Sequence, residues 1–188
     1  DLRQLGLIGT GVTDEGLAVV ESMQDLQRLR LSSTEVTDDG LRFLEGRGSL
    51  LELLLDDTGV TDDGVARLED SREMRVLDMY GTRLTDEGME MIGRFRHLVI
   101  IDIGDTAITI KGLEELKGLE ELEELYLDRT VVGDESIGIV SGMPVLRSLG
   151  LSGTELTDVG VRKLAGMAGL ERLDMGGTTV SDTGITLL

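Results

Sequence analysis

The sequence predicts an α/β solenoid made of eight repeats, each with one short strand and one short helix. The first observation is a fixed period, because a threonine recurs every 24 residues without insertion or deletion. A period between 20 and 50 residues is the signature of a solenoid. The second and third observations are the apolar spacing and a recurring T-D-x-G phrase within each repeat. Positions are counted from the threonine as zero, which falls at Thr10, Thr34, Thr58, Thr82, Thr106, Thr130, Thr154 and Thr178.

The strand of each repeat is predicted from apolar residues at positions −5 and −3, such as Leu29 and Leu31. Spacing of two residues indicates a strand with one buried face. Strands of the same direction in every repeat must be parallel and need a crossover between them. Eight short strands are therefore expected to form one parallel sheet.

The crossover, from position +2 to about +13, is predicted to contain a short helix with one buried stripe, as at Val36, Leu41 and Leu44. The Asp at +4 favours the positive end of the helix dipole. Glycine at +6 is costly inside a helix, so its recurrence predicts close approach between neighbouring coils. The helix N-caps are expected at position +3, at Thr13, Thr37, Thr61, Thr85, Thr157 and Ser181.

The threonine at position zero lies between strand and crossover, where backbone groups face inward. A small polar side chain repeated once per coil can bond the backbone of the next coil. We therefore expect the eight threonines to form a ladder along the solenoid.

The phrase L-x-x-L-x-L-x-x-T-x-[VLI]-T-D-x-G-[LVIM] resembles the leucine-rich repeat superfamily, whose general pattern is L-x-x-L-x-L-x-x-N/C-x-L. The T-D-x-G-L extension is similar to the cysteine-containing subclass and to bacterial repeats of that type. The match covers essentially the whole chain, and the departure is threonine in place of Asn or Cys. The resemblance implies a right-handed arc or horseshoe with the sheet on its concave face and the helices on its convex face. It also implies a binding role, usually toward another protein, and no catalysis.

Composition limits the partners. The formal charge is −19, from 37 acidic and 18 basic residues, and it repels nucleic-acid phosphates and anionic lipids. The charge favours basic partners or cations, unless it serves only solubility or adaptation to salt. Cysteine is absent, which excludes disulfides and thiol catalysis, and no apolar run is long enough to span a membrane. We expect residues 1–188 to form a single domain without capping repeats, as a fragment of something larger.

The candidate binding surface is the exposed face of the sheet, at positions −6, −4 and −2, with −7 and −1 at its margins. In repeats three to six these positions hold acids at Glu52, Asp56, Asp57, Asp78, Asp102, Asp105, Glu123, Glu124 and Asp128, and only two arginines. In the other repeats they hold Arg3, Arg28, Arg30, Arg147 and Arg172, and only two acids. The face is therefore predicted to have an acidic centre and more basic ends.

Both tyrosines of the chain fall on this face, beside the aliphatic residues Leu54, Val76 and Ile100. Tyrosine is enriched at interface hot spots, although β-branched and aromatic residues are also ordinary choices for exposed strand positions. Aromatic and aliphatic anchors beside carboxylates suit a protein or peptide that offers Lys or Arg next to apolar groups. The predicted partner-binding residues are Leu54, Asp56, Asp78, Tyr80, Asp102, Tyr126 and Asp128.

Asp78 and Asp102 share position −4 in adjacent strands, which stand about 4.8 Å apart. Water can screen the two charges, which is the simplest interpretation. They can instead await a basic partner residue or an adventitious cation, or, most remotely, act as the acid/base pair of a hydrolase. The row of T-D-x-G carboxylates likewise allows a calcium hypothesis, but helix-start electrostatics explains that row more simply. We predict no metal site and no cofactor.

The sequence predicts a non-enzymatic protein-interaction module. The single His97 and the absence of a Ser/His/Asp grouping leave little for nucleophilic catalysis. The alternative is a structural or recognition arm of a larger adaptor or effector protein. Two repeats deviate from the phrase: the fifth has Ile110 at +4, and the sixth has Gly133 at +3 and Ser136 at +6. These changes are either drift on a solvated face or a local contact site.

Overall fold

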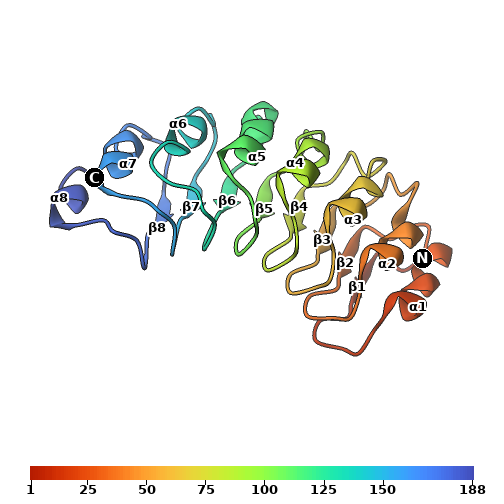
Figure 1. The fold of residues 1–188 in the computed structure, drawn as a ribbon. Helices are drawn as coiled ribbons and strands as arrows, with labels where there is room; N and C mark the ends of the chain where they lie inside the picture. The colour runs from red at the N-terminus through yellow and green to blue at the C-terminus, as the bar shows by residue number, and fades with distance from the viewer.

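In the computed structural model, residues 1–188 form a single curved solenoid of eight coils, one for each repeat (Figure 1). Each coil contributes one three-residue strand, and all eight pair in parallel, in chain order, within one sheet. The predicted parallel sheet is therefore confirmed. The strands are β1 (Gln4–Gly6), β2 (Arg28–Arg30), β3 (Glu52–Leu54), β4 (Val76–Asp78), β5 (Ile100–Asp102), β6 (Glu124–Tyr126), β7 (Ser148–Gly150) and β8 (Arg172–Asp174).

The predicted helices are also present, and they line the outer side of the arc while the sheet lines its inner side (Figure 1). The longest, α4 and α7, have seven residues each, and no helix is long and apolar enough to cross a membrane. Three coils continue into a 3₁₀ turn: η1 (Ala18–Ser22), η2 (Arg42–Leu44) and η3 (Glu115–Gly118). The α-helices are α1 (Asp14–Leu17), α2 (Asp38–Leu41), α3 (Asp62–Ala66), α4 (Asp86–Ile92), α5 (Ile110–Glu114), α6 (Ile137–Val140), α7 (Asp158–Leu164) and α8 (Asp182–Ile185).

One continuous hydrophobic core runs through the solenoid between the sheet and the helices. It contains 42 buried residues, among them the predicted strand pair Leu29 and Leu31 and the helix residues Leu41 and Leu44. Burial of one apolar face of each strand and one stripe of each helix stabilises neighbouring coils against each other, because no coil can bury its own apolar face alone.

The ladder predicted for the position-zero threonines is wrong. Each threonine hydroxyl instead donates to the carbonyl three residues earlier in its own coil, at 2.5–2.7 Å, as Thr82 does to Met79. The side chain is short and the chain turns at this point, so the carbonyl of the same turn is within reach. The backbone of the next coil is a full strand spacing away. The hydroxyl therefore closes the turn that ends the strand.

We expect Thr82→Val to lower the free energy of unfolding by about 1 kcal/mol, because the substitution keeps the shape of a buried side chain and removes one hydrogen bond. Urea denaturation followed by circular dichroism measures the change. Thr186→Val serves as the control, since its hydroxyl bonds the carbonyl of Thr183 on the exposed last coil. Equal loss in the two variants would contradict a particular role for the strand-end turn.

The bonds between coils come from the T-D-x-G phrase. The Asp at +4 of one coil accepts two bonds from the residue at +3 of the next coil. Asp62, for example, accepts the backbone N–H of Thr85 at 2.8 Å and its hydroxyl at 2.6 Å. We call this pair of bonds the carboxylate clamp. The expected N-cap bonds are also present at every predicted position except Thr13. The acid thus lies in the first turn of its own helix, as predicted, and also bonds the residue before the next coil's helix, which was not predicted.

The glycine at +6 completes the clamp. A Cβ added at Gly88 would lie 2.5 Å from Oδ1 of Asp62, and its N–H donates to the same oxygen at 3.1 Å. The same 2.5 Å approach to the preceding coil's Asp recurs at Gly40, Gly112 and Gly160. The predicted close approach between coils is therefore confirmed, and its cause is the carboxylate of the preceding coil.

Candidate protein-binding surface on the concave face

The concave face consists of the side chains at positions −6, −4 and −2 on the inner side of the sheet. The strand register places Leu54 beside Asp78, Asp78 beside Asp102, and Asp102 beside Tyr126. The structure therefore brings the predicted residues together on β3–β6. All seven are half-buried: Leu54, Asp56, Asp78, Tyr80, Asp102, Tyr126 and Asp128.

The predicted basic ends are largely neutralised. The guanidinium groups of Arg28 and Arg30 reach Glu52 of the next coil, with N–O distances of 3.6 and 2.6 Å. At the other end, Arg147 lies between Glu123 and Glu171, and Arg172 lies 3.1 Å from Glu124. Four of the five arginines are thus paired with glutamates, and these ion pairs were not predicted from the sequence.

The central aspartates have no such partner. Asp56, Asp78, Asp102 and Asp128 form no ion pair with any Lys or Arg of the chain. Asp78, Asp102 and Asp128 instead accept backbone N–H groups of their own or the next coil. The centre of the concave face therefore retains a negative potential after the arginines at its ends are paired.

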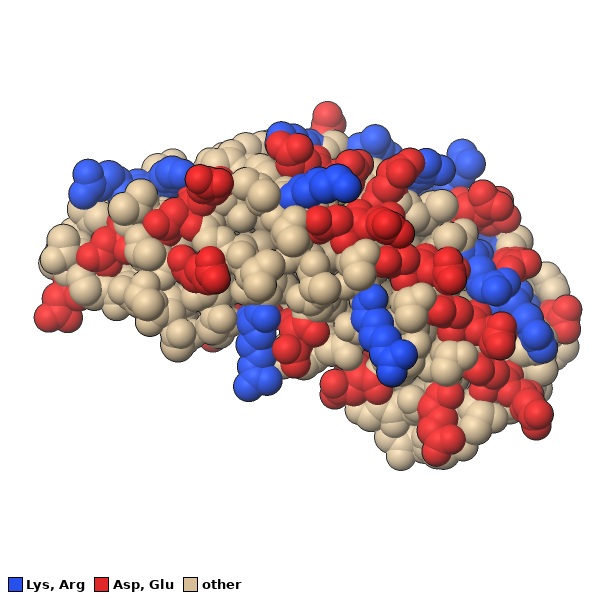
Figure 2. Space-filling model, in the orientation of Figure 1, with Lys and Arg blue, Asp and Glu red and all other residues tan.

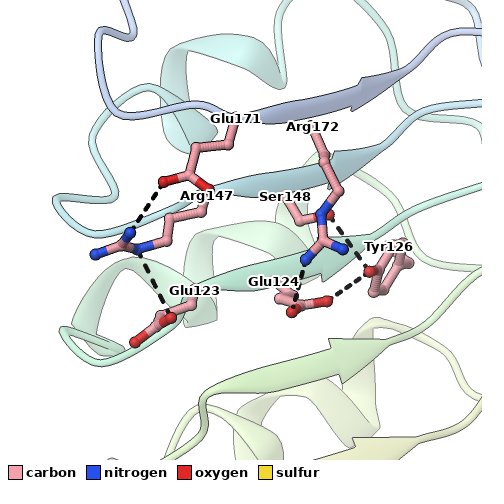
Figure 3. Close-up of polar contacts among 7 residues, drawn as sticks. All are labelled: Glu123, Glu124, Tyr126, Arg147, Ser148, Glu171 and Arg172. Carbon is pink, nitrogen blue, oxygen red and sulfur yellow. Dashed lines mark hydrogen bonds and ion pairs between the residues drawn. The ribbon is translucent and has the colours of Figure 1, made fainter.

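The second half of the face carries a polar network that the sequence analysis missed (Figure 3). Arg172 reaches from β8 across Ser148 of β7 to Glu124 on β6, and the Tyr126 hydroxyl donates to Glu124 at 2.6 Å. Burial, together with the hydrogen bond to Glu124, raises the pKa of Tyr126, so its phenol stays neutral at physiological pH. The small residues Ser148 and Gly150 in β7 were the sequence sign that side chains from β6 and β8 meet over this strand.

Each tyrosine leans over a glycine of the following coil. A Cβ at Gly104 would lie 2.9 Å from Cδ2 of Tyr80, and a Cβ at Gly150 would lie 2.8 Å from Cδ1 of Tyr126. The rings are held against the sheet, so they present one face and an edge to a partner at little further cost in conformational entropy.

A depression of about 530 Å³ lies over β7, beside Tyr126 and Arg172. Its floor is formed by Ser148, Leu149 and Gly150, and Asp128 and Asp174 line it as well. It adjoins the predicted residues and extends the concave surface toward the C-terminal coils.

Burial changes the acidity of the central pair. It raises the pKa of Asp78 to about 6 and that of Asp102 to about 7, against the opposing bonds from the backbone N–H groups of Tyr80 and Gly104. Repulsion from Asp56 adds to both increases, and Asp78 itself acts on Asp102. Both carboxyls are therefore expected to titrate closer to neutral pH than an exposed aspartate does. Burial of the two carboxyls, and not their mutual repulsion, is the largest cause of both increases.

The surroundings of the aspartate pair bear on the hydrolase and cation alternatives. Neither Asp78 nor Asp102 lines the depression over β7. No three Asp, Glu or His side chains lie close enough together to hold a metal ion. The T-D-x-G carboxylates considered for calcium accept the clamp bonds, and those from Ser181 lower the pKa of Asp158. On the side of the molecule shown in Figure 2, acidic side chains gather over the N-terminal half with isolated basic ones among them.

The comparisons with known proteins agree with this geometry. A family model described as "Leucine Rich repeat" matches residues 22–44, 71–93 and 142–165, each of which spans one strand and the following helix. No curated protein matches the sequence significantly. Among solved structures, an internalin C2 from Listeria monocytogenes superimposes with a TM-score of 0.77 at 22% sequence identity, over 95% of this chain and 73% of that chain. The chain therefore contains leucine-rich repeats and has the fold of a leucine-rich-repeat solenoid.

Proposed function

We propose that this chain is a non-enzymatic protein-interaction module that binds a basic, partly apolar protein segment on the concave face. The contact residues are Leu54, Asp56, Asp78, Tyr80, Asp102, Tyr126 and Asp128. The proposal rests on a difference in ion pairing between the ends and the centre of this face. The arginines at its ends are paired, and the half-buried aspartates at its centre have no cation. The T-D-x-G phrase further supports assignment to the cysteine-containing subclass or its bacterial relatives.

A lysine or arginine of the partner would form ion pairs with Asp78 and Asp102. Its cationic end can lie between Asp78 and Asp102, while its aliphatic stem contacts Leu54, Val76 or the ring of Tyr80. Long basic side chains combine these two properties, and a desolvated cation is also attracted to a tyrosine face. Because a bound cation favours the ionised carboxyls, binding releases protons in the range where the pair titrates.

Synthetic peptides test the proposal. A peptide of lysine and leucine is expected to bind, whereas matched peptides of glutamate and leucine, or of lysine and serine, are expected to bind at least about tenfold more weakly. Affinity for the lysine–leucine peptide is expected to increase from pH 5.5 to pH 8, because Asp78 and Asp102 become ionised over that range. Isothermal titration calorimetry measures both effects.

Variants identify the surface. Asp102→Lys and the double variant Tyr80→Ala/Tyr126→Ala are each expected to weaken binding of the lysine–leucine peptide by about tenfold or more. The control is Glu73→Lys, which makes the same change of charge at an exposed position outside the concave face. If Glu73→Lys weakens binding as much as Asp102→Lys, the attraction comes from net charge alone, and the assignment to the concave face is wrong.

We assign no enzymatic activity, because an acid/base pair needs a site that encloses its substrate and the Asp78–Asp102 pair lies on an open face. Hydrolysis of a glycoside by the wild-type chain that Asp102→Asn abolishes would overturn this assignment.

A further inference from the structure

The seven joints between successive coils are not equivalent. Six of them contain the carboxylate clamp, with an N–H to Oδ1 distance of 2.8 Å in every case. The joint between the fifth and sixth coils lacks it. There Ile110 replaces the aspartate, and Gly133 replaces the residue whose hydroxyl and N–H it would accept.

The substitutions in the fifth and sixth repeats therefore meet at the same joint. The sixth coil also carries Ser136 at +6, where every other coil carries glycine. At a clamped joint, a Cβ at this position would collide with the aspartate of the preceding coil. Ser136 is buried and its side chain makes no capping bond to the helix. The hydroxyl donor, the carboxylate acceptor and the glycine are lost together at a single joint, whereas Asp86 before it and Asp134 after it still form clamps.

A second bond is missing at the same joint. At the six other joints the N–H at position +1 donates to the carbonyl at +2 of the preceding coil at 3.0–3.2 Å, as Ala107 does to Leu84 and Glu155 does to Val132. The corresponding bond from Val131 to Ile108 is not formed. The helix side of this joint thus lacks both kinds of polar contact that hold neighbouring coils together.

Packing is also reduced there. α5 and α6 are the one successive pair of helices without substantial contact. A depression of about 270 Å³ opens between their coils, and the side chains of Ile110 and Val131 on its wall are 39% and 60% exposed.

The inner side of the same joint is intact. β5 and β6 pair in the same parallel register as every other pair of strands. Ile103 donates to the carbonyl of Tyr126 at 3.1 Å, and Asp105 donates to that of Asp128 at 2.7 Å. The joint is therefore held along the sheet and released along the helices.

We infer that the joint between the fifth and sixth coils is a hinge, pivoting on the β5–β6 ladder, which lets residues 1–120 and 121–188 change the curvature of the arc between them. Hinges are a few positions that absorb such a change while the parts on either side stay rigid. Asp102 lies on one side of the pivot and Tyr126 and Asp128 lie on the other. If the concave face binds a partner as proposed above, hinge motion changes the angle at which the contact residues on the two sides of the pivot face the partner.

Distance measurements between spin labels test the hinge without any partner, so the result does not depend on the proposed function. The chain has no cysteine, so two can be introduced at chosen positions. Glu114→Cys/Arg162→Cys places labels on α5 and α7, two coils apart and across the hinge. Arg42→Cys/Glu90→Cys places labels at the same repeat position, also two coils apart, across two clamped joints. All four residues are exposed.

Double electron–electron resonance is expected to give a distance distribution about twice as broad for the first pair as for the second. The clamp can then be restored with Ile110→Asp/Gly133→Thr/Ser136→Gly, which should narrow the first distribution to the width of the second. Equal widths for the two pairs in the otherwise unchanged chain would overturn the hinge. The hinge would also be overturned if the clamp-restoring variant is folded by circular dichroism but its Glu114→Cys/Arg162→Cys distance distribution stays broad.

Discussion

Gly88→Ala is expected to lower the free energy of unfolding by about 2–4 kcal/mol. The added Cβ would lie 2.5 Å from Oδ1 of Asp62 and 2.6 Å from Cδ1 of Leu84. Either the carboxylate moves and its bonds to Thr85 and Gly88 break, or the helix moves away from the preceding coil. Denaturation in urea, followed by circular dichroism, measures the loss.

Gly138→Ala is the matched control. Gly138 is also a helical glycine, but no atom lies within 4 Å of the Cβ it would acquire. Alanine is a better helix former than glycine, so this variant should be more stable by about 0.5–1 kcal/mol. If both substitutions destabilise the chain equally, the cost at Gly88 comes from the helix backbone and not from the carboxylate clamp.

Asp102→Asn is expected to raise the free energy of unfolding at pH 8 by about 1–2 kcal/mol, a figure reduced from the full pKa shift because the side chain is partly exposed. The amide keeps an oxygen that can accept the N–H of Gly104 and removes a charge repelled by Asp78 and Asp128. At pH 4 the wild-type carboxyl is already protonated in the folded chain, so the substitution should change stability little.

Proton linkage determines whether the stability of the chain rises or falls with pH. The folded pKa of Asp102, about 7, is above its ordinary value of 3.8, so the folded chain holds more protons than the unfolded chain between these limits. Stability should therefore decrease as the pH rises from about 4 to about 7, and Asp78 adds to the decrease up to about pH 6. Thermal unfolding of wild type, Asp102→Asn and the exposed control Glu73→Gln across this range measures the slope. A wild-type slope no steeper than that of Asp102→Asn would contradict the pKa of Asp102.

Most of the fold follows from the sequence because every coil repeats the same local requirements. The apolar pairs at −5 and −3 and the caps at +3 depend only on neighbours close in the chain or one period away. A glycine at −1 in half of the repeats was also informative, since that position has a positive φ in all eight coils, including 53° at Asp57 and 49° at Asp105. Position −1 was predicted to lie at the margin of the binding face, whereas it lies in the turn that follows the strand.

The candidate site was predictable in its position but not in its electrostatics. Alternation along the strands was enough to place Asp78, Tyr80 and Asp102 on one face. It could not show that Arg30 turns toward Glu52, or that Arg172 crosses a whole coil to reach Glu124, because these pairings depend on side-chain rotamers. The position-zero threonine hydroxyl was given the wrong bonding partner, and the bonds from the T-D-x-G carboxylate to the next coil were not predicted, for a related reason. Each repeats once per coil, and periodicity alone does not distinguish a bond within a coil from a bond between coils.

The carboxylate clamp also determines which repeats can be moved without losing the bonds between neighbouring coils. Because each coil offers an aspartate to the coil after it and a threonine and glycine to the coil before it, most coils can be duplicated, deleted or exchanged as whole 24-residue cassettes with every junction preserved. The sixth coil is the exception. Deleting the fifth coil would place Asp86 against Gly133, which has no hydroxyl to donate, and against the Cβ of Ser136. The fifth and sixth coils can therefore be duplicated, deleted or exchanged only together.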